Sequence, residues 1–176
     1  MLNVRPAPSE YAAYFDRYVS LVPESDVLAV LNGQAERVHA ALSGLSDERA
    51  GHRYAPDKWS VREWLGHIID AERVFGYRAM SIARGEVQSL PSFDEKTYAE
   101  AANHEQTPID DLAEEFATLR RSHVLMLKHL TPDAWGRVGD VGGHNTTTRG
   151  MAFIMAGHVR HHANVMKERY GIPVRA

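Results

Sequence analysis

The sequence predicts an all-α protein, a four-helix bundle with a long crossover between the second and third helices. Apolar residues recur with the helical period along nearly the whole chain, and no convincing run alternates as a strand would. The length of 176 residues, with 44% hydrophobic and 24% charged side chains, suits one core. We assign residues 24–176 to this bundle and expect residues 1–23, with several prolines and tyrosines, to form an N-terminal arm packed on it.

The first long helix is predicted over residues 25–45. Gly44 and the Ser46-Asp47 turn mark its end, and a loop through Trp59 follows. Its apolar stripe has the i, i+3, i+4, i+7 spacing of an amphipathic helix. The stripe consists of Leu28, Leu31, Ala35, Val38, Leu42 and Leu45.

The second helix has the clearest start signal in the chain. Ser60 and Glu63 have the spacing of a capping box, in which each side chain bonds the backbone N–H of the other residue. The helix is expected to continue to Arg84, where Gly85 supplies a C-terminal stop. Residues 85–106 then form the long crossover link.

The third and fourth helices follow the crossover. Thr107 is a suitable N-cap and Pro108 a suitable first residue for a helix that extends to about Leu130. Residues 131–135 predict one short extra turn, and residues 136–147 an irregular, glycine-rich segment. The last helix is expected from about residue 148 to residue 171.

Composition excludes several classes of function. The chain has no cysteine, so disulfides and Cys-ligated zinc are excluded. A net charge of −3 gives no basic excess for nucleic-acid binding. No stretch approaches the apolar length of a membrane span, and the first residues lack the apolar segment of a secretory signal. We therefore expect a cytoplasmic protein that binds neither membranes nor nucleic acids.

Histidines carry the chemical signal, because ten occur and several lie inside helical patterns. At 100° per residue, His158 and His162 lie about 40° apart on the apolar face of the last helix, and His161 lies at the edge of that face. An i, i+4 histidine pair can bind one metal ion. The alternative is a pair of core histidines hydrogen-bonded to protein groups.

His67 lies on the apolar stripe of the second helix. A lone core histidine is more often structural, but imidazoles buried on two helices need partners for their polar atoms, and one divalent metal satisfies them together. Periodicity alone leaves His123 and His39 as competing ligands. Asp70, three residues after His67, is either a hydrogen-bond acceptor or fourth ligand for the site, or an ordinary surface aspartate.

The remaining polar candidates are given no role in the site. We expect four histidines in loops or near helix ends to be exposed to solvent, and two glutamates to form surface ion pairs. These are His52, His104, His129, His144, Glu72 and Glu168.

Two runs, KWSVREWLGHIIDAERVFGYRA (58–79) and MAFIMAGHVRHHANVMKERYG (151–171), resemble the signature stretches of the DinB-like, or YfiT-like, superfamily of metal-dependent enzymes. The resemblance implies a four-helix bundle, a homodimer and the metal ligands His67, His158 and His162. His161 then takes the place of a neighbouring histidine that is not a ligand, and with Asp70 it is a candidate to support the ligands. The loop VGGHNTTTRG (141–150) departs from the family pattern.

The resemblance also implies a chemistry. Three imidazoles leave open positions on a divalent ion, by default zinc, with nickel, iron or manganese as alternatives. The superfamily includes metal-dependent hydrolases and transferases that use low-molecular-weight thiols, so we expect hydrolysis or thiol transfer with a thiol co-substrate. No catalytic residue is assigned. The alternatives are a non-catalytic metal-binding or stress-associated module, and a structural core without metal.

Overall fold

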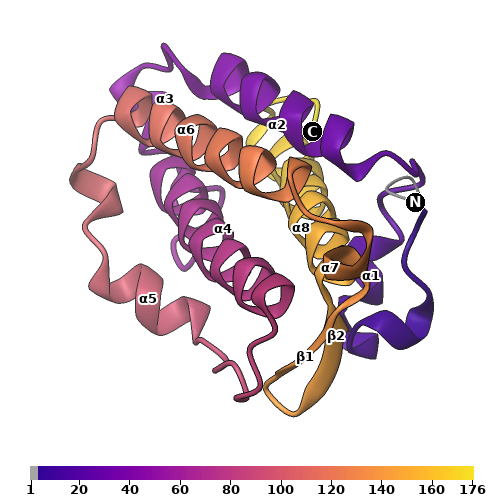
Figure 1. Ribbon diagram of the computed structural model, residues 1–176. Helices are drawn as coiled ribbons and strands as arrows, with labels where there is room; N and C mark the ends of the chain where they lie inside the picture. The colour runs from indigo at the N-terminus through magenta and orange to yellow at the C-terminus, as the bar shows by residue number, and fades with distance from the viewer. Residues whose placement is uncertain (1–3) are drawn as a thin grey trace.

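The computed structural model describes residues 4–176, and four long helices form its bundle (Figure 1). These are α2 (Val27–Leu42), α4 (Val61–Arg84), α6 (Ile109–Lys128) and α8 (Thr148–Tyr170). Helix α6 packs on α2 and α4, and α8 packs on the same two helices from the other side. The predicted all-α four-helix bundle is confirmed.

Local sequence signals explain where α4 and α8 begin and end. The Ser60 hydroxyl accepts a hydrogen bond from the Glu63 N–H, and the Glu63 carboxylate accepts one from the Ser60 N–H at 2.7 Å. Thr147 caps α8 in the same way, by accepting a bond from Gly150 N–H. Both helices end at a glycine with positive φ, 84° at Gly85 and 67° at Gly171. The predicted bounds of the two helices that carry the site histidines are therefore confirmed closely.

The start of α6 differs from the prediction. Pro108, with ψ 136°, is the residue before the helix, and no side chain caps it. The Thr107 hydroxyl donates instead to the Asn103 carbonyl at 3.1 Å. The expected N-cap at Thr107 is wrong because the extended backbone at Pro108 delays the helix by one residue.

The crossover between α4 and α6 is long, as predicted, but it is partly helical. It contains α5 (Glu95–Ala101) and the 3-10 turn η3 (His104–Gln106), and both lie along α4. Asp94 starts α5 by accepting hydrogen bonds from the N–H groups of Lys96 and Thr97. The crossover therefore covers one face of α4.

Three short helical segments precede the bundle. They are η1 (Pro8–Glu10), η2 (Ala13–Phe15) and α1 (Asp16–Val19), and α1 packs on α8. A Cβ added at Gly157 would lie 2.0 Å from the Tyr18 carbonyl oxygen, so the α1 backbone rests directly on α8. This close approach brings arm side chains beside the α8 histidines.

Residues 138–147 form a β-hairpin, not the irregular segment that the sequence predicts. Strands β1 (Val138–Val141) and β2 (His144–Thr147) pair antiparallel. Gly142 and Gly143, both with positive φ, make the two-residue turn. The expectation that the chain has no strands is wrong here because two strands of four residues are too short to show alternation. Within residues 4–176, no helix has both the length and the apolar character that crossing a membrane requires.

Candidate metal centre

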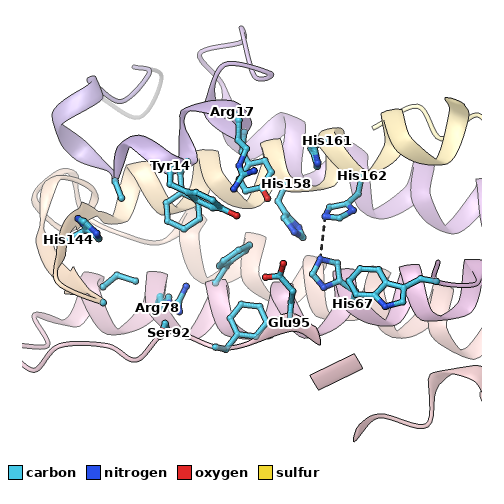
Figure 2. A pocket seen from close by; sticks show the side chains of 18 residues that line it. Tyr14, Arg17, His67, Arg78, Ser92, Glu95, His144, His158, His161 and His162 are labelled. Atoms are coloured by element: carbon cyan, nitrogen blue, oxygen red, sulfur yellow. Dashed lines mark hydrogen bonds between the residues drawn. The ribbon is translucent and has the colours of Figure 1, made fainter. Parts of the chain in front are cut away.

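Three histidine side chains meet between α4 and α8. His67 comes from α4, His158 and His162 come from α8, and one nitrogen of each ring lies within 4.8 Å of the others (Figure 2). The Nε2 atoms of His67 and His162 are 3.3 Å apart. His67 and His158 are about 95% buried, and His162 is half-buried. The histidines singled out in the sequence therefore converge from two helices that are adjacent in space.

Burial keeps the three imidazoles neutral. It lowers the pKa of His67 to about 4 and that of His162 to about 2, and it lowers the pKa of His158 well below its usual value. The mutual repulsion of the three rings, if charged, acts in the same direction on His158 and His162. Neutral imidazoles present lone pairs at pH 7, and nitrogen donors of this kind fit one divalent ion such as zinc.

Aromatic rings enclose the cluster. The ring centroid of Trp59 lies 4.8 Å from that of His67, and those of Tyr18 and Phe75 each lie 5.3 Å from that of His158, with the rings nearly perpendicular. Among residues 4–176, no carboxylate or carbonyl hydrogen-bonds to the three imidazoles, and their one hydrogen bond joins His67 to His162. The imidazole nitrogens are therefore not engaged by acidic or backbone groups of these residues, and they are available to bind a cation.

The competing histidines lie elsewhere. His123 Nδ1 bonds the Glu72 carboxylate at 2.8 Å, and His39 pairs with Glu114 at 3.4 Å. Neither belongs to the group of converging nitrogens. His161 lies beside the cluster, with its ring 5.2 Å from that of His162.

Asp70 does not bond a histidine of the cluster. Its carboxylate is 3.3 Å from His104 Nε2 and 3.7 Å from an Arg73 nitrogen. His104 is half-buried, with 14% of its side chain exposed, so its predicted exposure to solvent is wrong. The physical reason is that η3 lies against α4 and places the His104 ring directly over Gly66, which has no side chain to exclude it.

Glu72 is the largest departure from the predicted surface. It is only 2% exposed and pairs with the fully buried Arg120 at 2.7 Å. Arg120 also donates to the side-chain oxygen of Gln34 at 2.7 Å, and the side-chain amide of Gln34 donates to the Ala156 backbone carbonyl at 2.8 Å. With His123 these side chains form a second buried polar group, which we call the Arg120 network. A surface pair was expected because a helical stripe does not reveal which charged residue points inward.

A pocket of about 500 Å³ opens above the three histidines. The arm, the crossover and the hairpin all contribute to it, because each of them borders the space between α4 and α8 (Figures 1 and 2). Its polar lining, besides the three histidines, consists of Tyr14, Arg17, Tyr18, Trp59, Arg78, Ser92, Glu95, His144 and His161. His144 is exposed, as predicted, but it lies on the pocket wall.

Sequence reasoning missed the charged residues of this pocket. Arg17, Arg78 and Glu95 come from the arm, α4 and α5, three separate segments. Only Arg78 could have been found from the sequence, because it is an arginine within the apolar stripe of the second helix. Arg17 and Glu95 are surface-type residues in segments whose packing the sequence does not specify.

The fold and this cluster define the class: a helical-bundle protein with three histidines grouped beneath a pocket. The sequence model of the DinB superfamily matches residues 31–166. The chain belongs to the DinB superfamily.

One solved structure extends this likeness to nearly the whole chain. YfiT from Bacillus subtilis, described as a probable metal-dependent hydrolase with an unusual four-helix bundle topology, matches with a TM-score of 0.73 and 17% identity. The match covers 95% of this chain and 93% of that chain. At this level of identity the likeness establishes a shared fold. No protein with a curated description matches the sequence.

Proposed function

We propose that this protein is a metal-dependent enzyme in which His67, His158 and His162 hold one divalent ion. The observation that carries the proposal is the convergence of three neutral ring nitrogens, within 4.8 Å of one another, beneath a pocket. Zinc is the default for a set of three imidazoles, and nickel, iron and manganese are the alternatives. The description of YfiT as a probable metal-dependent hydrolase supports the same assignment.

Hydrolysis is the favoured reaction. A bound divalent ion would supply Lewis acidity, lowering the pKa of water and polarising an acyl or phosphoryl group. Glu95, the only carboxylate that lines the pocket within residues 4–176, points toward the histidines in Figure 2. We assign Glu95 the role of accepting a proton from the attacking water. Trp59 and Phe75, beside the histidine rings, limit the access of bulk water.

The metal assignment is tested on the full-length protein purified without chelators. We expect one equivalent of divalent metal by mass spectrometry, and loss of that metal in His67→Ala and in His158→Ala. His129→Ala is the matched control, since His129 is exposed and lies outside the pocket. Absence of stoichiometric metal, or equal loss in all three variants, would overturn the assignment.

The reaction is tested with the metal-loaded protein and panels of esters, amides and phosphate esters. We expect turnover that His158→Ala abolishes and Glu95→Gln reduces about 100-fold. Turnover found only when a low-molecular-weight thiol and an electrophile are supplied would replace hydrolysis by thiol transfer. Metal binding without metal-dependent turnover in either panel would favour a non-catalytic metal-binding module.

The homodimer implied by the family resemblance stays a prediction. Sedimentation velocity of the full-length protein tests it directly, with a single species of twice the chain mass as the expected result.

A further inference from the structure

One buried cation in the pocket has no counter-ion among residues 4–176. Arg78 is 96% buried on α4, and none of the ion pairs among residues 4–176 includes it. Its Nη2 donates to the Pro91 carbonyl at 2.6 Å, while its buried Nε has no partner. A guanidinium carries five N–H donors, so most of its hydrogen-bonding capacity is unused.

Aromatic rings, not carboxylates, surround the Arg78 guanidinium. The rings of Phe75 and Phe93 each lie 5.9 Å from the guanidinium carbon, at cation–π distance. Burying a charge without a partner is costly, and natural proteins seldom retain one that has no role. The contrast is Arg120, which is also buried but has Glu72 as its counter-ion.

A second arginine reaches the same pocket from the arm. Arg17 of α1 lies 3.5 Å above the centre of the Tyr14 ring and likewise forms no ion pair within the described chain. The pocket therefore has two arginines and one carboxylate, Glu95, before any metal is counted. In Figure 2, Arg78 lies farther along the pocket from the three histidines, on the far side of Glu95, and Arg17 lies over the pocket from the arm.

From this arrangement we propose that the substrate is a small organic anion, whose carboxylate or phosphate group binds Arg78, with Arg17 as a second contact. This inference rests on the proposed function, because it places the anionic group in the same pocket as the candidate metal centre. The planar fork of a guanidinium matches both carboxylate and phosphate oxygens in a bidentate way. The reacting bond then lies over the histidines, and the anionic end fixes the orientation of the substrate.

The proposal is tested by calorimetric titration of the full-length protein with succinate and with inorganic phosphate. Succinamide and trimethyl phosphate serve as the neutral analogues. The titrations are made on metal-free and on zinc-loaded protein. We expect binding of the anions, but not of the neutral analogues, in both forms. Whichever of succinate and phosphate binds more tightly identifies the source of the anionic group.

Three variants assign the binding to the arginines. Arg78→Met should weaken anion binding about 10- to 100-fold, the usual loss for a charge-assisted, bidentate contact. Arg78→Lys should lose less, because it keeps the charge but not the fork. Arg84→Met is the matched control, since Arg84 lies on the same helix but is exposed and outside the pocket. If Arg78→Met fails to fold, Arg17→Met on the exposed arm replaces it, with a smaller expected loss.

Each remaining outcome decides one of the two proposals. Equal affinities of Arg78→Met and Arg84→Met, or equal binding of acids and neutral analogues, would overturn the anion site. If the anion binds only to zinc-loaded protein, and Arg78→Met does not change its affinity, the anion binds the metal. This result would overturn the present inference but not the metal centre. If the wild type binds no zinc but its metal-free form binds the anion in an Arg78-dependent way, the proposed function is overturned and the anion site is retained.

Discussion

Two buried polar clusters lie in the same bundle, and they differ in whether the protein completes them. In the Arg120 network, the guanidinium pairs with the Glu72 carboxylate and donates to the side-chain oxygen of Gln34 and to the Met155 carbonyl, and its Nε alone has no partner. The cluster of His67, His158 and His162 contains three neutral groups of one kind, in contact with one another and open to a pocket. The Arg120 network contains its own counter-ion, whereas three neutral imidazole nitrogens that face one another beside a cavity are suited to bind a cation.

The two clusters are built on some of the same helices. Helices α4 and α8 contribute to both clusters, and Glu72 of the network follows His67 by little more than one turn of α4. The network ties α2, α4, α6 and α8 together at the level of Ala156, two residues before His158. The closed cluster can therefore hold rigidly the two helices from which the open cluster projects.

Breaking the closed cluster should have the largest effect on stability. Arg120→Met leaves the Glu72 carboxylate buried without its counter-ion, and such a loss typically costs about 3–5 kcal/mol. We expect a corresponding fall in the free energy of unfolding in urea. The matched control is Arg121→Met, on the exposed face of the same helix, which should change stability by less than about 0.5 kcal/mol. Similar losses in the two variants would show that the network does not stabilise the bundle.

Completing the open cluster should stabilise the protein. Zinc at about 100 times its dissociation constant raises the free energy of unfolding by about 2.7 kcal/mol, if the unfolded chain does not bind it. We expect this shift in thermal melting of the wild type but not of His158→Ala. The Arg120→Met variant, where it remains folded, should show the shift as well. An equal shift in His158→Ala would place the zinc elsewhere.

Separating the arm from α8 should affect the pocket more than the bundle. A Cβ in Gly157→Ala would meet the Tyr18 backbone, which cannot rotate away, so the arm must move. Overpacking of this kind costs about 1–3 kcal/mol. Gly136→Ala is the control, because no atom lies within 4 Å of its added Cβ. We expect hydrogen exchange in residues 8–19 to rise only in Gly157→Ala, and unchanged protection there would contradict the close approach.

The smallest effect concerns an ion pair between Glu24, in the segment before α2, and Arg160 of α8. Two hydrogen bonds from Arg160 lower the pKa of Glu24 to about 2. Because the folded pKa lies below the usual 4.5, the pair contributes stability above about pH 4.5 and loses it as the pH falls toward 2. Glu24 is 46% exposed, so screening by solvent keeps the contribution below about 1 kcal/mol.

This contribution is measured as the difference in melting temperature between wild type and Glu24→Gln, both metal-free. The difference should favour the wild type near neutral pH and shrink steadily below about pH 4.5. A difference that stays constant down to about pH 3 would mean that the pair does not contribute.

The sequence predicted the open cluster better than the closed one, for a physical reason. Ser60, Gly85 and Gly171 define the ends of α4 and α8, and helical phase then places His67, His158 and His162 on apolar faces. The same phase placed His123 on an apolar face but could not show that Glu72, a charged residue, points inward to meet it. Periodicity distinguishes apolar from polar faces, but which polar groups pair depends on the packing of several helices.

The pocket walls could not be predicted from helical periodicity, because short segments outside the four long helices form much of them. The crossover became helical at Glu95–Ala101, and the hairpin formed at Val138–Val141 and His144–Thr147, in segments too short to carry a pattern. Arg17 and Glu95 enter the pocket only because the arm packs on α8 and the crossover packs on α4. Chain segments of this kind are placed by tertiary packing, so their contribution to the site becomes visible only in the structure.

X-ray absorption at the zinc edge of the loaded, full-length protein tests the central claim most directly. The account predicts one zinc per chain with three imidazole nitrogens at about 2.0–2.1 Å, and the loss of one imidazole contribution in His67→Ala. A zinc bound by fewer than three imidazoles in the wild type, or an unchanged spectrum in His67→Ala, would contradict it.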